Sequence, residues 1–207
     1  MKSQDLRTRR TSQAMARAQD AAIELFEEQG FDHVTVDDVA QRAGVGVASL
    51  YRWFGTKERL VLWDEYDAPL FARTELHLHE GKGPFDAILL SLLEGLGELY
   101  ERDKKRILRR ADLIASTPAL INAARLDTHL LREGFSKLFA EVATDPLERE
   151  LLAAVIATTL ETGVEEWRRR RGRVPLDELL LRAFELLATF PRLRGAQGSQ
   201  RRRARKV

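Results

Sequence analysis

The sequence predicts an all-α protein, with a small N-terminal three-helix unit, a larger C-terminal helical bundle and about nine helices in total. Two observations lead to this fold class. Apolar residues recur at three- and four-residue spacing along most of the 207 residues, whereas the alternation typical of a strand is almost absent. The prolines stand where a helix could begin, end or break: Pro69, Pro84, Pro118, Pro146, Pro175 and Pro191.

Glycines separate the helices predicted for the N-terminal unit. In SQAMARAQDAAIELFEEQG the apolar spacing predicts the first helix, and Gly30 supplies a left-handed stop. In TVDDVAQRAG, Thr35 is a suitable N-cap with Asp38 three residues later, and Gly44 ends the helix. A third short helix is predicted over residues 47–54.

The rest of the chain consists of amphipathic stretches between prolines. A fourth helix, capped by Thr56, starts near Lys57 and meets Pro69, which predicts a kink or a break. Five further stretches are predicted to be helical: 84–100, 102–116, 118–143, 146–171 and 175–190. The last of them has a leucine-rich stripe, which predicts a buried face.

Residues 43–60 read AGVGVASLYRWFGTKERL and combine small side chains with crowded aromatic rings. Two short helices joined by AGVG are typical of a helix-turn-helix. One face of the second helix is apolar and is predicted to be buried: Val47, Leu50 and Phe54. The opposite face carries small or polar side chains: Ala48, Ser49 and Arg52. Such a face lets the helix backbone enter the major groove of B-DNA, where Tyr51 and Trp53 on the rims can reach phosphates or base edges.

Two other interpretations fit part of this stretch. It would be an ordinary helical hairpin if its aromatic rings merely filled a core, since helix-turn-helix geometry also occurs in proteins that bind no DNA. The segment GVGVAS half-matches a dinucleotide-binding glycine loop, but that motif needs a preceding strand and a third glycine. Here a helix precedes and Ser49 takes the last place, so we discount the nucleotide loop.

Residues 21–61, AAIELFEEQGFDHVTVDDVAQRAGVGVASLYRWFGTKERLV, closely resemble the N-terminal DNA-binding domain of TetR-family transcriptional regulators. The resemblance implies that the third helix enters the major groove and that a homodimer reads a near-palindromic operator on double-stranded DNA. By position it implies phosphate contacts from three residues: Thr35, Tyr51 and Lys57. Lys57 would lie in the first turn of the next helix, where backbone N–H groups and the helix dipole favour a phosphate. The residues nearest the bases would be Val47, Ala48, Ser49, Arg52 and Trp53.

The chain departs from the family pattern at two positions. Gly46 replaces the usual serine that caps the third helix, so this cap is weakened or is supplied by the backbone alone. Asp37 stands near the place where some relatives have a basic contact, and its carboxylate would repel phosphate. Because the first two residues of the third helix offer only apolar contacts, base specificity is expected to depend on a small set: Ser49, Arg52 and Trp53.

The charge distribution and the predicted helices divide the chain into four segments. We expect a basic disordered arm over 1–11, a helix-turn-helix domain over 12–56, a ligand-binding and dimerisation domain over 57–190, and a basic disordered tail over 191–207. The net charge is only +2, so DNA contact requires the positive groups to lie on one side. The arm either follows the DNA backbone, enters the minor groove or is a solvated terminus. The tail fits a non-specific electrostatic or solubilising end.

Residues 84–190 are similar to the C-terminal domain of the same family, in the subgroup with an acyl-CoA-like ligand domain that includes regulators associated with mycofactocin clusters. The similarity is carried by ADLIASTPALINAARL and LLAAVIATTLETGVEEW. It implies that the helices at 146–171 and 175–190 pair with their two-fold mates, and that an effector occupies a cavity between helices. The candidate lining residues are polar or aromatic side chains in apolar stretches: Trp63, Tyr66, His129 and Thr162. Taken alone, each of them more commonly has an ordinary core or surface role.

Composition excludes several other classes. Cysteine is absent and no apolar run is long enough for a membrane span, so we predict a cytoplasmic protein without disulfides or membrane contact. No metal site or other cofactor is predicted, because His77 and His79 fall on different helix faces. No nucleophile–base pair, carboxylate pair or phosphate loop is found, so an enzyme is not predicted.

The sequence therefore predicts a ligand-responsive transcriptional regulator, and a repressor in particular. It would bind its operator as a homodimer and be released by a small apolar or acyl-type effector. The alternative is a ligand-insensitive architectural DNA-binding protein that uses its basic ends for non-specific contacts.

Overall fold

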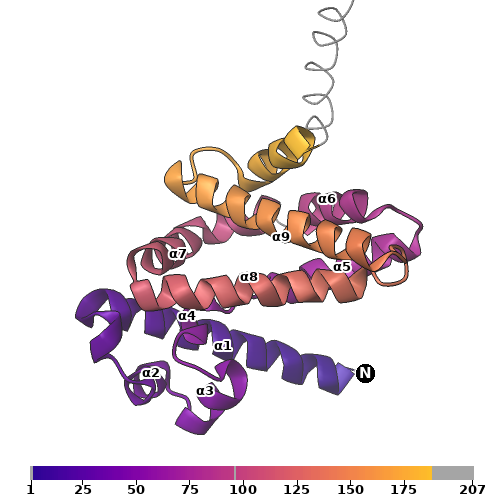
Figure 1. The fold of residues 1–207 in the computed structure, drawn as a ribbon. Helices are drawn as coiled ribbons and strands as arrows, with labels where there is room; N and C mark the ends of the chain where they lie inside the picture. Colours follow the sequence, from indigo (N-terminus) through magenta and orange to yellow (C-terminus); the bar gives the residue numbers. More distant parts are fainter. Residues whose placement is uncertain (1, 96, 188–207) are drawn as a thin grey trace, which may run out of the picture.

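The computed structural model describes residues 2–95 and 97–187, with the side chains of residues 10–95 and 102–187. Within these ranges the chain is mainly helical and contains no strand, which confirms the predicted all-α class. In chain order the helices are α1 (Lys2–Gln29), the 3-10 helix η1 (Phe31–His33), α2 (Val36–Ala43), α3 (Val47–Phe54), α4 (Arg59–Leu62), α5 (Asp67–His79), α6 (Pro84–Gly95), α7 (Gly97–Ser116), α8 (Pro118–Leu138) and α9 (Pro146–Arg169). A last helix over residues 176–187 follows and carries no label in Figure 1.

Prolines mark where several helices begin. The first residues of α6, α8 and α9 are prolines: Pro84, Pro118 and Pro146. A proline fits this position because the first N–H groups of a helix have no intrahelical partner. Pro69 lies in the first turn of α5, so the predicted break falls just before that helix. No helix boundary lies between residues 100 and 102, where one was predicted, because α7 runs from Gly97 to Ser116.

The N-terminal arm differs from its prediction. Residues 1–11 were expected to be disordered, whereas α1 already begins at Lys2. The stretch from Lys2 to Gln29 contains neither glycine nor proline. The buried part of α1 nucleates the helix. Each residue added toward the N-terminus then loses its conformational entropy but gains one backbone hydrogen bond, so the helix extends outward. The predicted tail over 191–207 lies outside the described residues.

The N-terminal helices surround one hydrophobic core, in which Leu50 and Phe54 of α3 pack against α1 and α2. Leu60 and Val61 of α4 are also buried there, so this unit extends beyond the boundary expected at residue 56. Two side chains of the C-terminal part complete the same core: Leu113 of α7 and Leu120 of α8. The two parts of the chain are therefore joined by shared apolar packing.

The C-terminal helices enclose a second hydrophobic core. Phe135 and Phe139 stack at 5.8 Å between ring centroids, and Trp167 of α9 is fully buried. Figure 1 shows α8 running between the N-terminal helices and α9, and α8 contacts α4, α7 and α9. Helix α8 therefore packs directly against both parts of the chain.

Candidate nucleic-acid interface and internal cavity

Helix α3 is fixed at both ends by the backbone. At its N-terminus Gly46 offers no side-chain cap, and its carbonyl accepts hydrogen bonds from Ser49 N at 2.8 Å and Leu50 N at 3.3 Å. The turn before it depends on Gly44, whose φ of 67° lies in the left-handed region that glycine adopts without strain. At its C-terminus Gly55 N donates to Tyr51 O at 2.9 Å. The structure thus shows the backbone-only cap that the sequence left open.

The two faces of α3 differ in exposure. Leu50 and Phe54 are 1% and 3% exposed, whereas Tyr51 is 52% exposed. Ala48 and Arg52 are exposed, and Val47, Ser49 and Trp53 are half-buried. Arg52 Nη2 donates to Ser49 Oγ at 3.2 Å, and the Arg52 guanidinium lies 6.0 Å from the centroid of the Trp53 ring. The three residues expected to read bases therefore form one connected group on the accessible side.

Thr35 acts as the N-cap of α2 through a reciprocal capping box. Its hydroxyl oxygen accepts from Asp38 N at 3.2 Å, and Thr35 N donates to Asp38 Oδ2 at 2.8 Å. The hydrogen bond from the Thr35 hydroxyl holds the pKa of Asp38 below its usual range. Thr35 itself is exposed, so the capped end of α2 is accessible to solvent.

Lys57 points back into the N-terminal unit. Its Nζ donates to the Phe31 carbonyl oxygen and lies 4.3 Å from the centroid of the Phe31 ring and 5.5 Å from that of Phe26. Helix α4 begins only at Arg59, so Lys57 lies before its first turn rather than within it. This corrects the predicted geometry, in which the ammonium would lie beside free N–H groups of α4.

A cavity of about 490 Å³ lies in the C-terminal part, within the size range usual for small-molecule sites. Its walls come from the segment before α5, from α5, α6, α7, α8 and α9, and from the last helix. Most of the lining is apolar and includes Leu70, Leu92, Ala111, Ile114, Ala115, Ile121, Ala124, Leu131, Leu160, Val164, Leu176 and Leu180. The polar lining residues are Asp64, Tyr66, Asp67, Arg125, Thr128, Glu161, Glu165 and Arg168.

The structure places only one of the four candidate ligand residues at this cavity. Tyr66 lines it, whereas Trp63 packs edge-on against Phe54 of the N-terminal core at 5.9 Å. His129 is on the surface, with Nε2 3.2 Å from Glu133, and Thr162 is exposed on α9. A single polar residue in an apolar stretch does not indicate which face of the helix is enclosed.

The charged lining residues were missed by the sequence analysis. Glu161, Glu165 and Arg168 recur at helical spacing on α9, beside Leu160 and Val164. The available signal was that these charges share a helix face with the buried Leu160 and the half-buried Val164.

Burial raises the pKa of two groups at the cavity. The pKa of Tyr66 rises to about 12, and the hydrogen bond from its hydroxyl to Asp103 Oδ2, at 2.8 Å, adds to the rise. The pKa of Asp67 rises to about 7, first through burial and then through the neighbouring Asp64 carboxylate. Both shifts favour the protonated form of the group.

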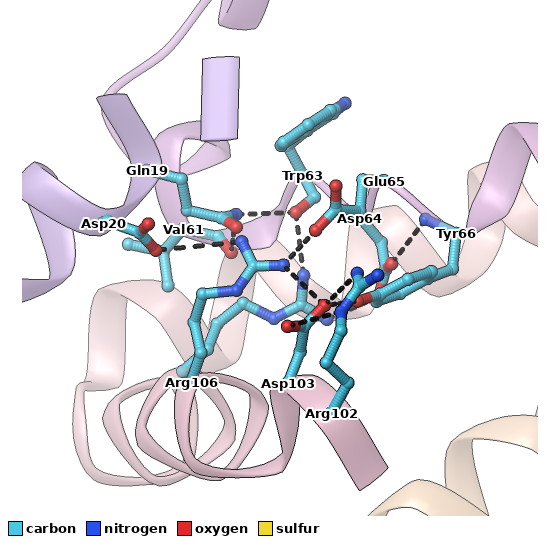
Figure 2. A network of polar contacts seen from close by, with 11 residues as sticks. Gln19, Asp20, Val61, Trp63, Asp64, Glu65, Tyr66, Arg102, Asp103 and Arg106 are labelled. Carbon is cyan, nitrogen blue, oxygen red and sulfur yellow. Dashed lines mark hydrogen bonds and ion pairs between the residues drawn. The ribbon is translucent and has the colours of Figure 1, made fainter. Parts of the chain in front are cut away.

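A polar network connects the cavity to the N-terminal unit (Figure 2). Arg110 of α7 binds the Asp64 carboxylate and donates to the Trp63 carbonyl oxygen at 2.8 Å. Gln19 of α1 donates to the same carbonyl at 2.7 Å. Arg106 of α7 lies 3.7 Å from Asp20 of α1 and also pairs with Glu65. The segment before α5 is therefore held between α1 and α7, and Asp64 and Tyr66 at its end line the cavity.

Both ring nitrogens of His77 are engaged in protein contacts. His77 Nδ1 and Nε2 each lie 3.1 Å from a carboxylate oxygen, of Glu80 and Glu94 respectively. In the described part of the chain, no group of three His, Cys, Asp or Glu side chains is arranged to hold a metal ion. None of the described helices is both long and apolar enough to span a membrane.

Two family descriptions match the chain. Residues 19–62 match the bacterial regulatory proteins of the tetR family, and residues 82–191 match the MftR C-terminal domain. The fold and the exposed helix define a helix-turn-helix DNA-binding protein with a separate helical ligand-binding domain. The chain belongs to the TetR family of transcriptional regulators, which bind DNA operators as dimers and respond to small-molecule effectors.

Relatives of known name agree with this assignment. The Mycobacterium tuberculosis protein whose name is mycofactocin biosynthesis transcriptional regulator MftR is 27% identical over 192 residues, or 86% of this chain and 91% of its own. The HTH-type transcriptional repressor KstR of Rhodococcus jostii is 29% identical over 175 residues, or 81% of this chain and 79% of its own.

Solved structures share the fold. The SmeT–triclosan complex superimposes with a TM-score of 0.55 and 15% identity, covering 84% of this chain and 88% of the other. Thermus thermophilus FadR, a TetR-family repressor in complex with lauroyl-CoA, gives a TM-score of 0.52 and 20% identity, covering 84% and 93%.

Proposed function

We propose that this protein is a homodimeric repressor that binds a near-palindromic operator and is released when a small, mainly apolar effector enters the cavity. The observation that carries the proposal is the accessible face of α3. Ser49, Arg52 and Trp53 are grouped there, while Leu50 and Phe54 anchor the opposite face in the core.

In this proposal the two sides of α3 have different tasks. Ser49, Arg52 and Trp53 contact base edges in the major groove, and Val47 and Ala48 allow close approach or contact a thymine methyl group. Three residues contact phosphates and fix the register: Thr35, Tyr51 and Lys57. Lys57 exchanges its bond to the Phe31 carbonyl for a phosphate when DNA is present.

The dimer forms through α9 and the last helix. On α9 the outward face carries Leu147 and Leu151, which are 69% and 56% exposed, followed by the exposed Thr158 and Thr162. Leu186 of the last helix is 43% exposed. A stripe of leucine and small uncharged side chains on one helix face supports pairing with its two-fold mate.

The effector acts through the segment that joins the two parts of the chain. Asp64 and Tyr66 line the cavity and belong to the network that holds α1 against α7 (Figure 2). A ligand that prefers a different position of this segment changes the spacing of the two α3 helices. Because half-sites lie about 34–36 Å apart, such a change weakens operator binding.

Selection of bound sites from random DNA, followed by footprinting, tests the proposal. We expect one protected palindrome, and we expect Arg52→Ala to lose about 1–3 kcal/mol of discrimination at the bases it contacts. Lys137→Ala, which removes an exposed positive charge from α8, is the matched control and should leave both affinity and sequence preference unchanged. Uniform coating of the DNA would instead support the architectural alternative.

A further inference from the structure

The ionisable groups that line the cavity are mostly acidic. Four carboxyl groups and two guanidinium groups reach its wall: Asp64, Asp67, Glu161, Glu165, Arg125 and Arg168. Arg168 is already bound by Glu165 and by Asp112, at 2.7 and 3.0 Å. Asp64 is bound by Arg110. Within the described part of the chain, Asp67, Glu161 and Arg125 are the charged lining residues without an ion pair.

Asp67 has charged neighbours on several elements, but each positive neighbour is taken by another carboxylate. Arg59 of α4 pairs with Asp127 of α8 at 2.6 Å, and Arg110 of α7 pairs with Asp64. Both pairs are close to neutral, and Asp64 lies near enough to oppose ionisation of Asp67. When Asp67 is ionised, its negative charge therefore has no positive partner of its own at the cavity wall, where the side chain is exposed.

A carboxylate that lines an apolar wall without a positive partner favours a ligand that brings the opposite charge. Most of the remaining wall consists of leucine, isoleucine, valine and alanine side chains, which favour an apolar body. We propose that the effector is an amphipathic cation, an apolar molecule with one protonated amine that pairs with Asp67. This inference rests on the proposed function of the cavity as the effector site.

The same wall disfavours anionic ligands. A coenzyme A thioester brings several phosphate charges, which are bound in proteins by clusters of arginine and lysine. Here Arg125 is the guanidinium without an ion pair among the described lining residues, and two carboxyl groups without one, Asp67 and Glu161, line the same space. A fatty-acid carboxylate meets the same repulsion.

Probes of equal chain length isolate the charge of the head group. We would titrate the full chain with decylamine, decan-1-ol, decanoate and decanoyl-CoA at pH 8, by calorimetry and below the micellar concentration of each. Decylamine should bind about tenfold more tightly than decan-1-ol, the gain expected of a charge-assisted hydrogen bond. Decanoate and decanoyl-CoA should bind more weakly than the alcohol.

Substitution and pH locate the effect at Asp67. Asp67→Asn should reduce decylamine affinity to that of decan-1-ol, whereas Glu133→Gln, the same change at an exposed site on α8, should alter neither. In the unsubstituted protein, decylamine affinity should fall as pH drops from 8 through the pKa of Asp67 near 7, and decan-1-ol affinity should stay constant. The pH series keeps the test decisive if the Asn variant does not fold.

The inference is overturned if decan-1-ol, decanoate or decanoyl-CoA binds as tightly as decylamine, if Asp67→Asn leaves decylamine affinity unchanged, or if no probe binds. Operator binding by the same preparation is measured separately. If the protein binds its operator sequence-specifically and decanoyl-CoA releases it, the amphipathic cation is overturned and the proposed function is retained. Absence of sequence-specific binding would count against the proposed function itself.

Discussion

Lys57 and Arg52 both lie close to the C-terminal end of α3, but their environments differ. Arg52 is exposed, and its guanidinium donates to Ser49 and lies near the Trp53 ring, both on its own helix. Lys57 is half-buried and binds a carbonyl 26 residues earlier in the chain. The positive charge of Lys57 therefore contributes to the fold of the N-terminal unit as well as to any contact with DNA.

Lys57→Met should separate these two contributions. The methionine side chain retains much of the packing on Phe26 and Phe31 but loses the ammonium. We expect weaker binding to specific and non-specific DNA by similar factors, with the salt slope reduced by about 0.9, the value for one phosphate contact. Fluorescence anisotropy across a series of salt concentrations measures both the affinity for DNA and its salt slope. An unchanged slope would show that Lys57 serves the fold alone.

Which residue contacts can be predicted depends on their distance along the chain. The capping box of Thr35 and Asp38 was predictable because both partners lie within one helical turn. The position of Lys57 was not, because its acceptor lies in η1, which is brought near only when α1, α3 and α4 pack together. Trp63 was expected at the ligand cavity but packs against Phe54 of the N-terminal core, a contact that also depends on how the helices pack together.

At the scale of helices, prolines and glycines made most boundaries predictable. α3 has the predicted bounds, and α6, α8 and α9 start at the expected prolines. The C-terminal end of α8 was predicted at residue 143 but lies at Leu138, where a turn follows and buries Phe139 and Ala143. Apolar spacing continued through that turn, so the pattern alone did not reveal it.

Close packing of α9 against the last helix gives a prediction at this scale. A Cβ atom added at Gly163 would lie 2.4 Å from Leu180 Cδ2, and Leu180 is 2% exposed. Alanine is favoured over glycine in a helix interior by about 0.8–1 kcal/mol, so an open site would be stabilised. Gly163→Ala should instead destabilise the protein by about 1–3 kcal/mol because of overpacking.

Urea unfolding of a double-mutant cycle tests the origin of that loss. If the clash with Leu180 causes it, Gly163→Ala combined with Leu180→Ala should cost less than the sum of the two single changes. Additive costs would place the cause elsewhere on α9.

At the scale of the whole molecule, the coupling between the cavity and the DNA-binding unit passes through contacts that no local pattern reveals. Gln19 and Arg110 come from distant parts of the sequence, and both donate to the Trp63 carbonyl oxygen. Figure 2 shows Gln19 at this oxygen. The sequence indicated a ligand domain and a DNA-binding domain. It did not show that Leu113 and Leu120 complete the N-terminal core.

Arg110 is the residue whose loss should separate effector binding from operator release. It lies on α7, binds Asp64 at the cavity wall and holds the Trp63 carbonyl that Gln19 of α1 also contacts. Arg110→Met keeps much of the apolar stem but removes both contacts. In the unsubstituted protein, an effector should lower operator affinity by about 5–150-fold, the usual range of allosteric coupling. In Arg110→Met that factor should fall toward one, although operator and effector each still bind.

Operator affinity measured with and without the tightest-binding decyl probe gives the factor. Arg182→Gln, which removes an ion pair within the last helix, is the control. Because linkage is reciprocal, effector affinity measured with and without operator DNA must give the same factor. If Arg110→Met retains full coupling, the signal passes through α8 and its contact with α4 rather than through this network.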